Sequence, residues 1–237
     1  MNYYAGIDLG GTFVKGGIVD EEGNILVKDK IPTGKERPYA EIAADMAQLV
    51  LDLAKKAGIS PADVKAAGVG SPGTIDSKNG IIVYSNNIRW EKVPLGAELK
   101  KHLGIPVFAT NDANAAALGE SFAGAAKSYP SSVFITLGTG VGGGIILDNV
   151  LFEGNRSAGA EIGHMVIRMG GEKCTCGRKG CFEAYASATA LIRQTRNAMA
   201  KDKTSKLWEI CPNPEDVNGK TAFDGMRAGD AAAKQVV

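Results

Sequence analysis

The stretch PVFATNDANAAALGE, residues 106–120, decides how the rest of the chain is interpreted. A short apolar run ends abruptly in Asn111 and Asp112, and an Ala-rich stretch of helical composition follows at once. This pattern predicts a strand that carries an amide and a carboxylate at its carboxyl end, beside the amino terminus of a helix. Because open α/β sheets bind their ligands at that edge, we expect the functional site to include Asp112.

Length and composition are those of an ordinary globular protein. The 237 residues are enough for two lobes, and a net charge of +1 gives no electrostatic reason to expect nucleic acid or a membrane as a partner. Residues 1–20 lack the continuous apolar core of a signal peptide, so we expect a cytoplasmic protein. Three of the 4 cysteines lie within residues 174–181, which in that compartment indicates a metal site before disulfides.

Apolar periodicity predicts alternating strands and helices, and therefore an α/β fold. Three strand patterns with tight turns, 3–9, 14–19 and 25–31, indicate an antiparallel meander. The 3 and 4 spacing of apolar residues over 38–58 predicts an amphipathic helix. The other predicted elements are a buried strand 64–69, short strands over 75–90, a helix 95–103, a buried strand 132–137, a helix 186–201, a polar connection 203–225 and the start of a helix at 228.

Two stretches of the chain repeat each other. Residues 9–20 and 137–148 both run strand, Gly-rich turn, strand, acidic turn, and Gly10 corresponds to Gly138. Backbone N–H groups in such a turn point into one concavity and bind phosphate oxygens without cationic side chains. Chance matching of glycines and aliphatic residues is the alternative. We interpret the repeat as a duplicated lobe with a nucleotide-gripping hairpin in each half.

Five motifs then follow one another along the chain. They are DLGGTFVK (8–15), ATNDANAAALGE (109–120), LGTGVGGG (137–144), GAEIGH (159–164) and CTCGRKGCFEAYAS (174–187). Together they resemble the ROK family of bacterial sugar kinases and sugar-responsive repressors, and within it most of all the glucokinases. The resemblance implies an actin-like, ribonuclease H-like two-lobed α/β fold that uses ATP and Mg²⁺ and binds a hexose between its lobes.

The resemblance also implies where the lobes divide. Residues 1–122 would form an N-terminal lobe with the first phosphate motif and the catalytic Asp, and residues 123–237 a C-terminal lobe with the second phosphate motif and a zinc loop. Members of the family continue with further helices, a strand and another Gly-rich segment that holds the adenosine, and nothing in this chain matches that segment. We therefore expect an incomplete C-terminal lobe, from truncation or from a natural deletion.

Asp112 matches the family's catalytic base. A hexose hydroxyl is a poor nucleophile at neutral pH, so a carboxylate that accepts its proton assists phosphoryl transfer. The alternative role for an Asp in this place is to cap the helix. Amides and carboxylates also pair with vicinal sugar hydroxyls, and Asn86 is an alternative contact to its neighbour Asn87. The residues that match the family's sugar ligands are Gly73, Asn87, Asn111, Asp112, Glu161, His164 and Glu183.

The nucleotide contacts come from the two glycine turns. Asp8 matches the carboxylate that organises Mg²⁺, acting through water. Thr12 and Thr139 place hydroxyls beside the turn N–H groups, whereas Lys15 either reaches a phosphate or is a solvated strand lysine. The predicted cofactor-binding residues are Asp8, Gly10, Gly11, Thr12, Lys15, Gly138, Thr139 and Gly140.

A cluster of cysteines with one histidine forms the pattern H-x9-C-x-C-x4-C. Three thiolates and one imidazole make the closed tetrahedral set of structural zinc, and the family carries this site. A free-thiol cluster or a redox pair is the alternative. The ligands would be His164, Cys174, Cys176 and Cys181. Since His164 follows Glu161 by three residues, a bound ion would also fix the loop that presents sugar ligands.

Two functions remain open. The first is ATP-dependent phosphorylation of a hexose, with glucose leading and N-acetylmannosamine, N-acetylglucosamine, fructose or allose as alternatives. The second is sugar binding without catalysis, in a sensor or an inactive fragment. The family's repressors carry an N-terminal helix-turn-helix domain, whereas here the first phosphate strand begins at Tyr3. A homodimer or higher homo-oligomer is expected from the resemblance alone.

Overall fold

The computed structural model describes residues 1–237, with the side chain of Arg156 excepted. The chain forms two compact units. Unit 1 comprises Met1–Phe134 and Gly144–Ala160, and unit 2 comprises Ile135–Gly143 and Glu161–Val237. The lobe boundary expected between residues 122 and 123 stays a prediction.

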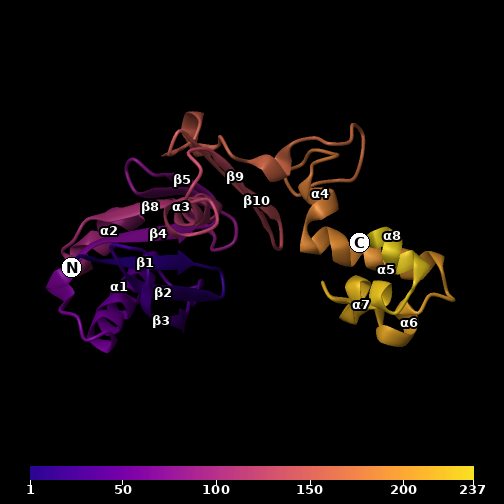
Figure 1. The fold of residues 1–237 in the computed structure, drawn as a ribbon, viewed down its shortest axis with the longest axis horizontal. Coiled ribbons are helices and arrows are strands. Elements are labelled where there is room, and N and C mark those ends of the chain that lie inside the picture. Colours follow the sequence, from indigo (N-terminus) through magenta and orange to yellow (C-terminus); the bar gives the residue numbers. More distant parts are fainter. The chain divides into compact units, whose positions relative to one another are not determined.

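A five-stranded sheet in the order β3-β2-β1-β4-β8 forms the centre of unit 1 (Figure 1). The first three strands pair antiparallel, which confirms the predicted meander, and β4 and β8 add to β1 in parallel. Parallel pairing brings the carboxyl ends of β1, β4 and β8 to one edge. The bounds are β1 (Tyr3–Leu9), β2 (Phe13–Asp20), β3 (Ile25–Pro32), β4 (Val64–Ser71) and β8 (Val107–Asn111), with helices α1 (Tyr39–Lys56), α2 (Leu95–Leu103) and α3 (Asp112–Ala123).

The two faces of this sheet carry different helices. Successive side chains of a strand point to opposite faces of the sheet. The residues paired with Ile7 and with Asp8 on the neighbouring strands therefore lie on opposite faces. Ile7 is paired with Gly16, which lies against Leu53 of α1. Asp8 is paired with Gly70, which lies against α3. The α1 face holds the main hydrophobic core, and each large aliphatic side chain buried there contributes roughly 1.5–3 kcal/mol.

A second, three-stranded sheet follows β4 and confirms the short strands expected over residues 75–90. Its strands are β5 (Thr74–Asp76), β6 (Ile81–Ser85) and β7 (Trp90–Val93), in that order. The loop before β5 contains Gly73, and the turn between β6 and β7 contains Asn87. This sheet therefore positions two of the predicted sugar ligands.

The hairpin of β9 (Ser132–Leu137) and β10 (Val141–Leu147), with β11 (Val150–Leu151), confirms that the strand, glycine turn and strand occur twice. The expectation that residues 132–137 are buried was wrong. Val133, Ile135 and Leu137 are 61%, 46% and 63% exposed, because they share one face of β9 and the described chain leaves that face uncovered. A short apolar run cannot by itself distinguish a buried strand from a strand with one uncovered face.

Unit 2 contains five helices around a small core. The polar connection expected over residues 203–225 was wrong, since one helix, 207–210, lies within that stretch and a second, 221–227, begins in it. Leu207 is fully buried, and the Trp208 indole donates to the carbonyl of Met199 at 3.0 Å. Helices this short hold too few apolar residues to show a period of 3.6. The bounds are α4 (Glu183–Ala186), α5 (Ala188–Lys201), α6 (Leu207–Ile210), α7 (Thr221–Arg227) and α8 (Ala231–Val236).

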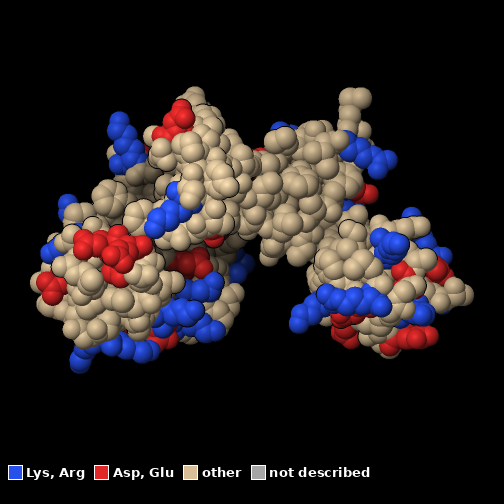
Figure 2. Space-filling view, in the orientation of Figure 1, with Lys and Arg blue, Asp and Glu red and all other residues tan. Residues whose placement is uncertain are grey.

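The surface of both units is of mixed charge. On the face drawn in Figure 2, acidic and basic side chains lie interspersed among uncharged ones. Within the part of the chain that the structure describes, no helix has the length and apolarity needed to span a bilayer.

Candidate active site

Asp112 is the first residue of α3 and follows β8 directly. The cap of this helix is its neighbour Asn111, whose Oδ1 accepts the N–H groups of Ala113 at 2.9 Å and Asn114 at 3.4 Å. Asp112 Oδ1 also accepts the Ala113 N–H, at 2.9 Å. Because Asn111 satisfies the helix terminus, α3 has a cap that does not depend on the Asp112 carboxylate.

The surroundings of Asp112 make it a stronger base than an ordinary aspartate. Crowding by protein atoms, which keeps water from the carboxyl, raises the pKa of Asp112, and the negative charge of Asp8 raises it further. The N–H of Ala113 opposes this change. The residue nevertheless remains accessible to solvent. A general base works best when its pKa approaches the working pH, so the direction of the change suits proton abstraction.

Asn111 also joins β8 to the loop before β5. Its Nδ2 donates to the carbonyl of Gly73 at 3.1 Å. Gly73 has a φ of 106°, and a side chain there would collide with the backbone of Tyr84, so glycine is required. The structure thus brings together three of the predicted sugar ligands, Gly73, Asn111 and Asp112.

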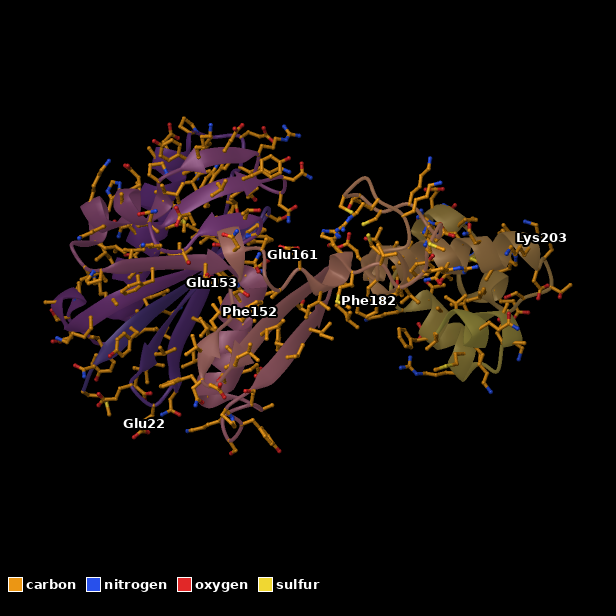
Figure 3. The ribbon with its side chains drawn as sticks, turned by 90° about the horizontal axis from the view of Figure 1, so that it is seen from above. Glu22, Phe152, Glu153, Glu161, Phe182 and Lys203 are labelled. Atoms are coloured by element: carbon orange, nitrogen blue, oxygen red, sulfur yellow. The ribbon has the colours of Figure 1, made fainter. Side chains whose placement is uncertain are left out.

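Glu153, which no sequence motif marks, links the same two segments. It follows β11 and is labelled in Figure 3. Its Oε2 accepts the hydroxyl of Ser77 at 2.8 Å, and its Oε1 accepts the hydroxyl of Thr110 at 3.4 Å. Ser77 comes directly after β5, and Thr110 precedes Asn111. Glu153 therefore braces the two segments that carry the three ligands.

The first glycine turn, residues 10–12, is held from the end of β3. Gly10 N–H donates to the carbonyl of Phe13 at 3.0 Å and closes the turn. Thr33, which is fully buried, donates its hydroxyl to the carbonyl of Gly10 at 2.6 Å and its N–H to that of Thr12 at 2.9 Å. Gly11 packs against the backbone of Asn87. Thr33 is a second residue that sequence reasoning missed, since it lies 23 residues from Gly10.

Asp8 and Lys15 form a cross-strand ion pair beside this turn. Lys15 Nζ lies 2.8 Å from Asp8 Oδ2, and both side chains are exposed. The hydrogen bond to Asp8 raises the pKa of Lys15, so the lysine stays charged. The predicted magnesium carboxylate and the predicted phosphate contact are therefore partners in this structure.

A hollow of unit 1 lies on the α3 face of the sheet and has a volume of about 450 Å³. Phe108, Leu118 and Leu151 supply its larger apolar side chains, and Glu153 its carboxylate. Asn111 and Asp112 are not among the described residues that line this hollow. This hollow is therefore distinct from the candidate sugar ligands.

The second glycine turn is anchored on the helices of unit 2. The N–H of Ala188, the first residue of α5, donates to the carbonyl of Gly138 at 2.8 Å, and the hydroxyl of Thr189 donates to that of Thr139 at 2.7 Å. These bonds fix two carbonyls of the turn on its helix side. Thr33 anchors the carbonyls of the first turn in the same manner, so both members of the repeat are held through their carbonyl groups.

Glu161 and His164 share one short turn, as their spacing predicts. Glu161, labelled in Figure 3, precedes a 3₁₀ turn over Ile162–His164, and the N–H of His164 donates to its carbonyl at 3.0 Å. A ligand that holds the imidazole would therefore also order the backbone of Glu161.

The histidine and three cysteines of the predicted metal site converge in unit 2. The ligand atoms of His164, Cys174, Cys176 and Cys181 all lie within 4.8 Å of one another. His164 Nδ1 is 3.6 Å from Cys174 Sγ, and the Sγ atoms of Cys176 and Cys181 are 3.7 Å apart. Tetrahedral zinc, with bonds of about 2.0 Å to nitrogen and 2.3 Å to sulfur, places its ligand atoms about 3.5–3.8 Å apart. The cluster fits zinc.

The cysteines of this cluster differ in acidity. The backbone N–H of Arg178, followed by its guanidinium, lowers the pKa of the Cys176 thiol to about 6. Burial raises the pKa of Cys181 to about 11. A cysteine must be a thiolate to bind a metal ion. A bound cation would therefore hold the buried Cys181 as a thiolate, whereas without the cation its side chain is a thiol at neutral pH.

Comparison with known proteins places this site in context. The chain is 40% identical over 232 residues to a glucokinase of Thermotoga maritima, covering 98% of this chain and 72% of that protein. It is 34% identical over 200 residues to a xylose repressor of Bacillus subtilis, covering 84% of this chain and 51% of the repressor.

The fold resembles a crystal structure of a ROK family glucokinase from Streptomyces griseus in complex with glucose and AMPPNP. The TM-score is 0.79 at 35% identity, over 99% of this chain and 74% of that one. The family model described as ROK family matches residues 4–237. On these grounds the chain belongs to the ROK family.

Proposed function

We propose that the protein is an ATP-dependent hexose kinase with glucose as its leading substrate. Asp112 carries this proposal, because its carboxylate stands at the carboxyl end of a parallel strand, beside a helix already capped by Asn111, and its pKa is raised. Similarity to kinases supports the same chemistry, among them the S. griseus protein whose structure contains glucose and AMPPNP.

In the proposed reaction a sugar hydroxyl attacks the γ-phosphorus of ATP. Asp112 accepts the hydroxyl proton as the new oxygen–phosphorus bond forms. The bond from the γ-phosphorus to the bridging oxygen breaks, and ADP leaves with its electron pair. Mg²⁺, when bound, neutralises charge on the phosphates, and Asp8 is the carboxylate proposed to hold it through water. The raised pKa of Asp112 assists the proton transfer.

The two glycine turns are proposed to hold the phosphates through their N–H groups. Anchoring of their carbonyls by Thr33 in one turn and by Ala188 in the other supports this role, because a fixed turn presents its N–H groups without reorganising. Lys15 is proposed to leave Asp8 and to reach a phosphate. The Lys15–Asp8 ion pair is exposed and therefore contributes little energy, so breaking it costs little.

Sugar recognition is proposed to use amide, carboxylate and imidazole groups. The ligands would be Gly73, Asn87, Asn111, Asp112, Glu161, His164 and Glu183. Structural zinc, held by the Cys₃His cluster, would act on sugar binding indirectly by ordering the turn of Glu161 and His164. With four protein ligands the ion would have no open position for chemistry.

A non-catalytic sugar sensor is the second candidate. The similarity to the xylose repressor of B. subtilis favours it, since the alignment with that protein covers 84% of this chain. The two functions predict the same sugar contacts and differ in whether ATP is consumed.

Coupled ADP-release measurements against a panel of hexoses test the proposal, with direct sugar binding followed by calorimetry on the same preparation. A kinase should release ADP in proportion to the sugar added, and Asp112→Asn should bind the sugar but release ADP about 10²–10⁴ times more slowly. Sugar binding with no ADP release by the wild type would instead support the sensor. Neither binding nor release for any hexose would overturn both.

A further inference from the structure

A single carboxylate touches both the metal loop and the second glycine turn. Glu183 begins α4, directly after Phe182, which is labelled in Figure 3. Its Oε1 accepts the hydroxyl of Thr175 at 3.1 Å and lies 3.7 Å from Cys174 Sγ. Its Oε2 accepts the N–H of Val141 at 3.0 Å. Val141 is the residue at which the turn becomes β10.

The turn is shaped to receive this carboxylate. A Cβ on Gly140 would overlap Oε2 of Glu183, the flexible end of that side chain, so the carboxylate lies directly against the backbone of the turn. The contact with Val141 fixes the peptide that follows Gly140. A hydrogen bond from an N–H to an ionised carboxylate is among the stronger kinds in proteins.

Among the described hydrogen bonds that anchor the turn, this one comes from a residue that also contacts the metal loop. Gly163, which precedes His164, packs against the Val141 backbone without a hydrogen bond. The bonds to Gly138 and Thr139 come from Ala188 and Thr189 of α5, and in the described part of the chain neither residue is hydrogen-bonded to Thr175 or Cys174. When a metal ion draws Cys174 and its neighbours into a fixed loop, the hydroxyl of Thr175 is held in place against Glu183. When the loop is free, Glu183 loses that support while remaining bonded to the turn.

We propose that Glu183 is a positioning residue that couples the Cys₃His loop to the second glycine turn, so that metal loading orders the N–H groups of that turn. This role is separate from any contact that Glu183 makes with a sugar. That the ordered turn binds a nucleotide phosphate depends on the proposed function. The coupling itself depends only on the contacts of Thr175, Glu183 and Val141.

Hydrogen exchange on the whole chain tests the coupling without relying on activity. Zinc-loaded protein and protein treated with a chelator are compared at the amide of Val141, with the wild type beside Glu183→Ala and Thr175→Val. We expect chelation to speed exchange at Val141 at least tenfold in the wild type. Both variants should exchange faster when loaded, and chelation should add little in Glu183→Ala. The matched control is Glu172→Gln, which changes an exposed glutamate paired with Arg193 and should behave as wild type.

Exchange at Val141 that is unchanged by chelation, while residues 174–181 become exposed to exchange, would overturn the proposal. So would a loaded Glu183→Ala variant, folded by circular dichroism, with both wild-type exchange at Val141 and wild-type sensitivity to chelation, because Ala removes both contacts. Thr175 is not a predicted sugar ligand, so Thr175→Val separates coupling from sugar contact.

Nucleotide binding, measured by calorimetry with AMPPNP in the absence of sugar, links the coupling to function. We expect Thr175→Val to raise the Kd for AMPPNP severalfold and to raise the KM for ATP more than it lowers kcat. If the wild type does not bind AMPPNP, the proposed function fails, and the exchange data still decide the coupling. If the wild type binds and Thr175→Val binds equally with altered exchange, the ordered turn is not the nucleotide contact.

Discussion

Asn111 makes two contacts that one substitution removes, so Asn111→Ala should destabilise unit 1 measurably. Its Oδ1 caps α3, and loss of an Asn cap costs about 0.5–2 kcal/mol. Its Nδ2 donates to Gly73, and a hydrogen bond of this kind contributes about 0.5–1.5 kcal/mol. The midpoints of the two ranges add to a loss in unfolding free energy of about 2 kcal/mol.

Asn111→Asp separates the two contributions. Aspartate keeps an acceptor oxygen at the cap and adds a favourable charge at the helix amino terminus, but when ionised it cannot donate to Gly73. We expect a loss of about 1 kcal/mol. Asn2→Ala is the control, because the Asn2 side chain makes an exposed contact to Glu21, and its loss should stay within about 0.5 kcal/mol.

Urea unfolding followed by tryptophan fluorescence measures these differences. Trp90 lies in β7 of unit 1 and is 6% exposed, whereas Trp208 lies in unit 2, so a Trp208→Phe background makes the emission report on unit 1. Equal losses for Asn111→Ala and Asn111→Asp would show that the cap contributes nothing. A loss below about 0.5 kcal/mol for Asn111→Ala would refute both contributions.

Four further outcomes are expected. Asp112→Asn cannot take a proton, so kcat in the ADP-release assay should fall by about 10²–10⁴ with the fold intact, and near-normal turnover would contradict the role of base. Because the pKa of Asp112 is raised above 3.8, its ionisation disfavours the folded state as pH rises through and above that value. Urea titrations should therefore find Asp112→Asn more stable than wild type at neutral pH, with the difference shrinking toward pH 3.8 and no such trend if the pKa is ordinary. Chelation should lower the melting temperature followed by circular dichroism and weaken glucose binding, and a metal-free folded protein that binds glucose normally would argue against the indirect role of zinc. Glu153→Ala removes the acceptor of Ser77 and Thr110 and should cost about 1–3 kcal/mol, whereas Glu153→Gln keeps an acceptor oxygen and should cost less; equal costs would count against the brace.

Features that depend on neighbours in the chain were predictable from the sequence. The three-stranded meander, α2 with its end at Gly104 and the strand that leads into Asp112 follow from local periodicity and turn chemistry. The convergence of His164 with three cysteines likewise follows from short spacing in one loop. In each case the pattern needs no knowledge of how distant segments pack.

Features that depend on distant segments were not predictable. Glu153 meets Thr110 and Ser77 across 43 and 76 residues, and no local pattern brings such side chains together. The exposed side of β9 also escaped prediction, because burial of an apolar strand depends on what the sheet packs against. The short helices α6 and α7 were hidden by the prolines between them, whose turn signals outweigh helices of four and seven residues.

The exposed side of β9 affects how the protein behaves at high concentration. An outermost strand offers unpaired backbone groups along its edge, and Val133, Ile135 and Leu137 line one face beside that edge with aliphatic groups. Neither a lysine nor a proline interrupts the stretch SVFITL. This strand is therefore a site at which copies of the protein would pair into intermolecular sheets. Ile135→Lys would place a charge on the exposed face and oppose this pairing.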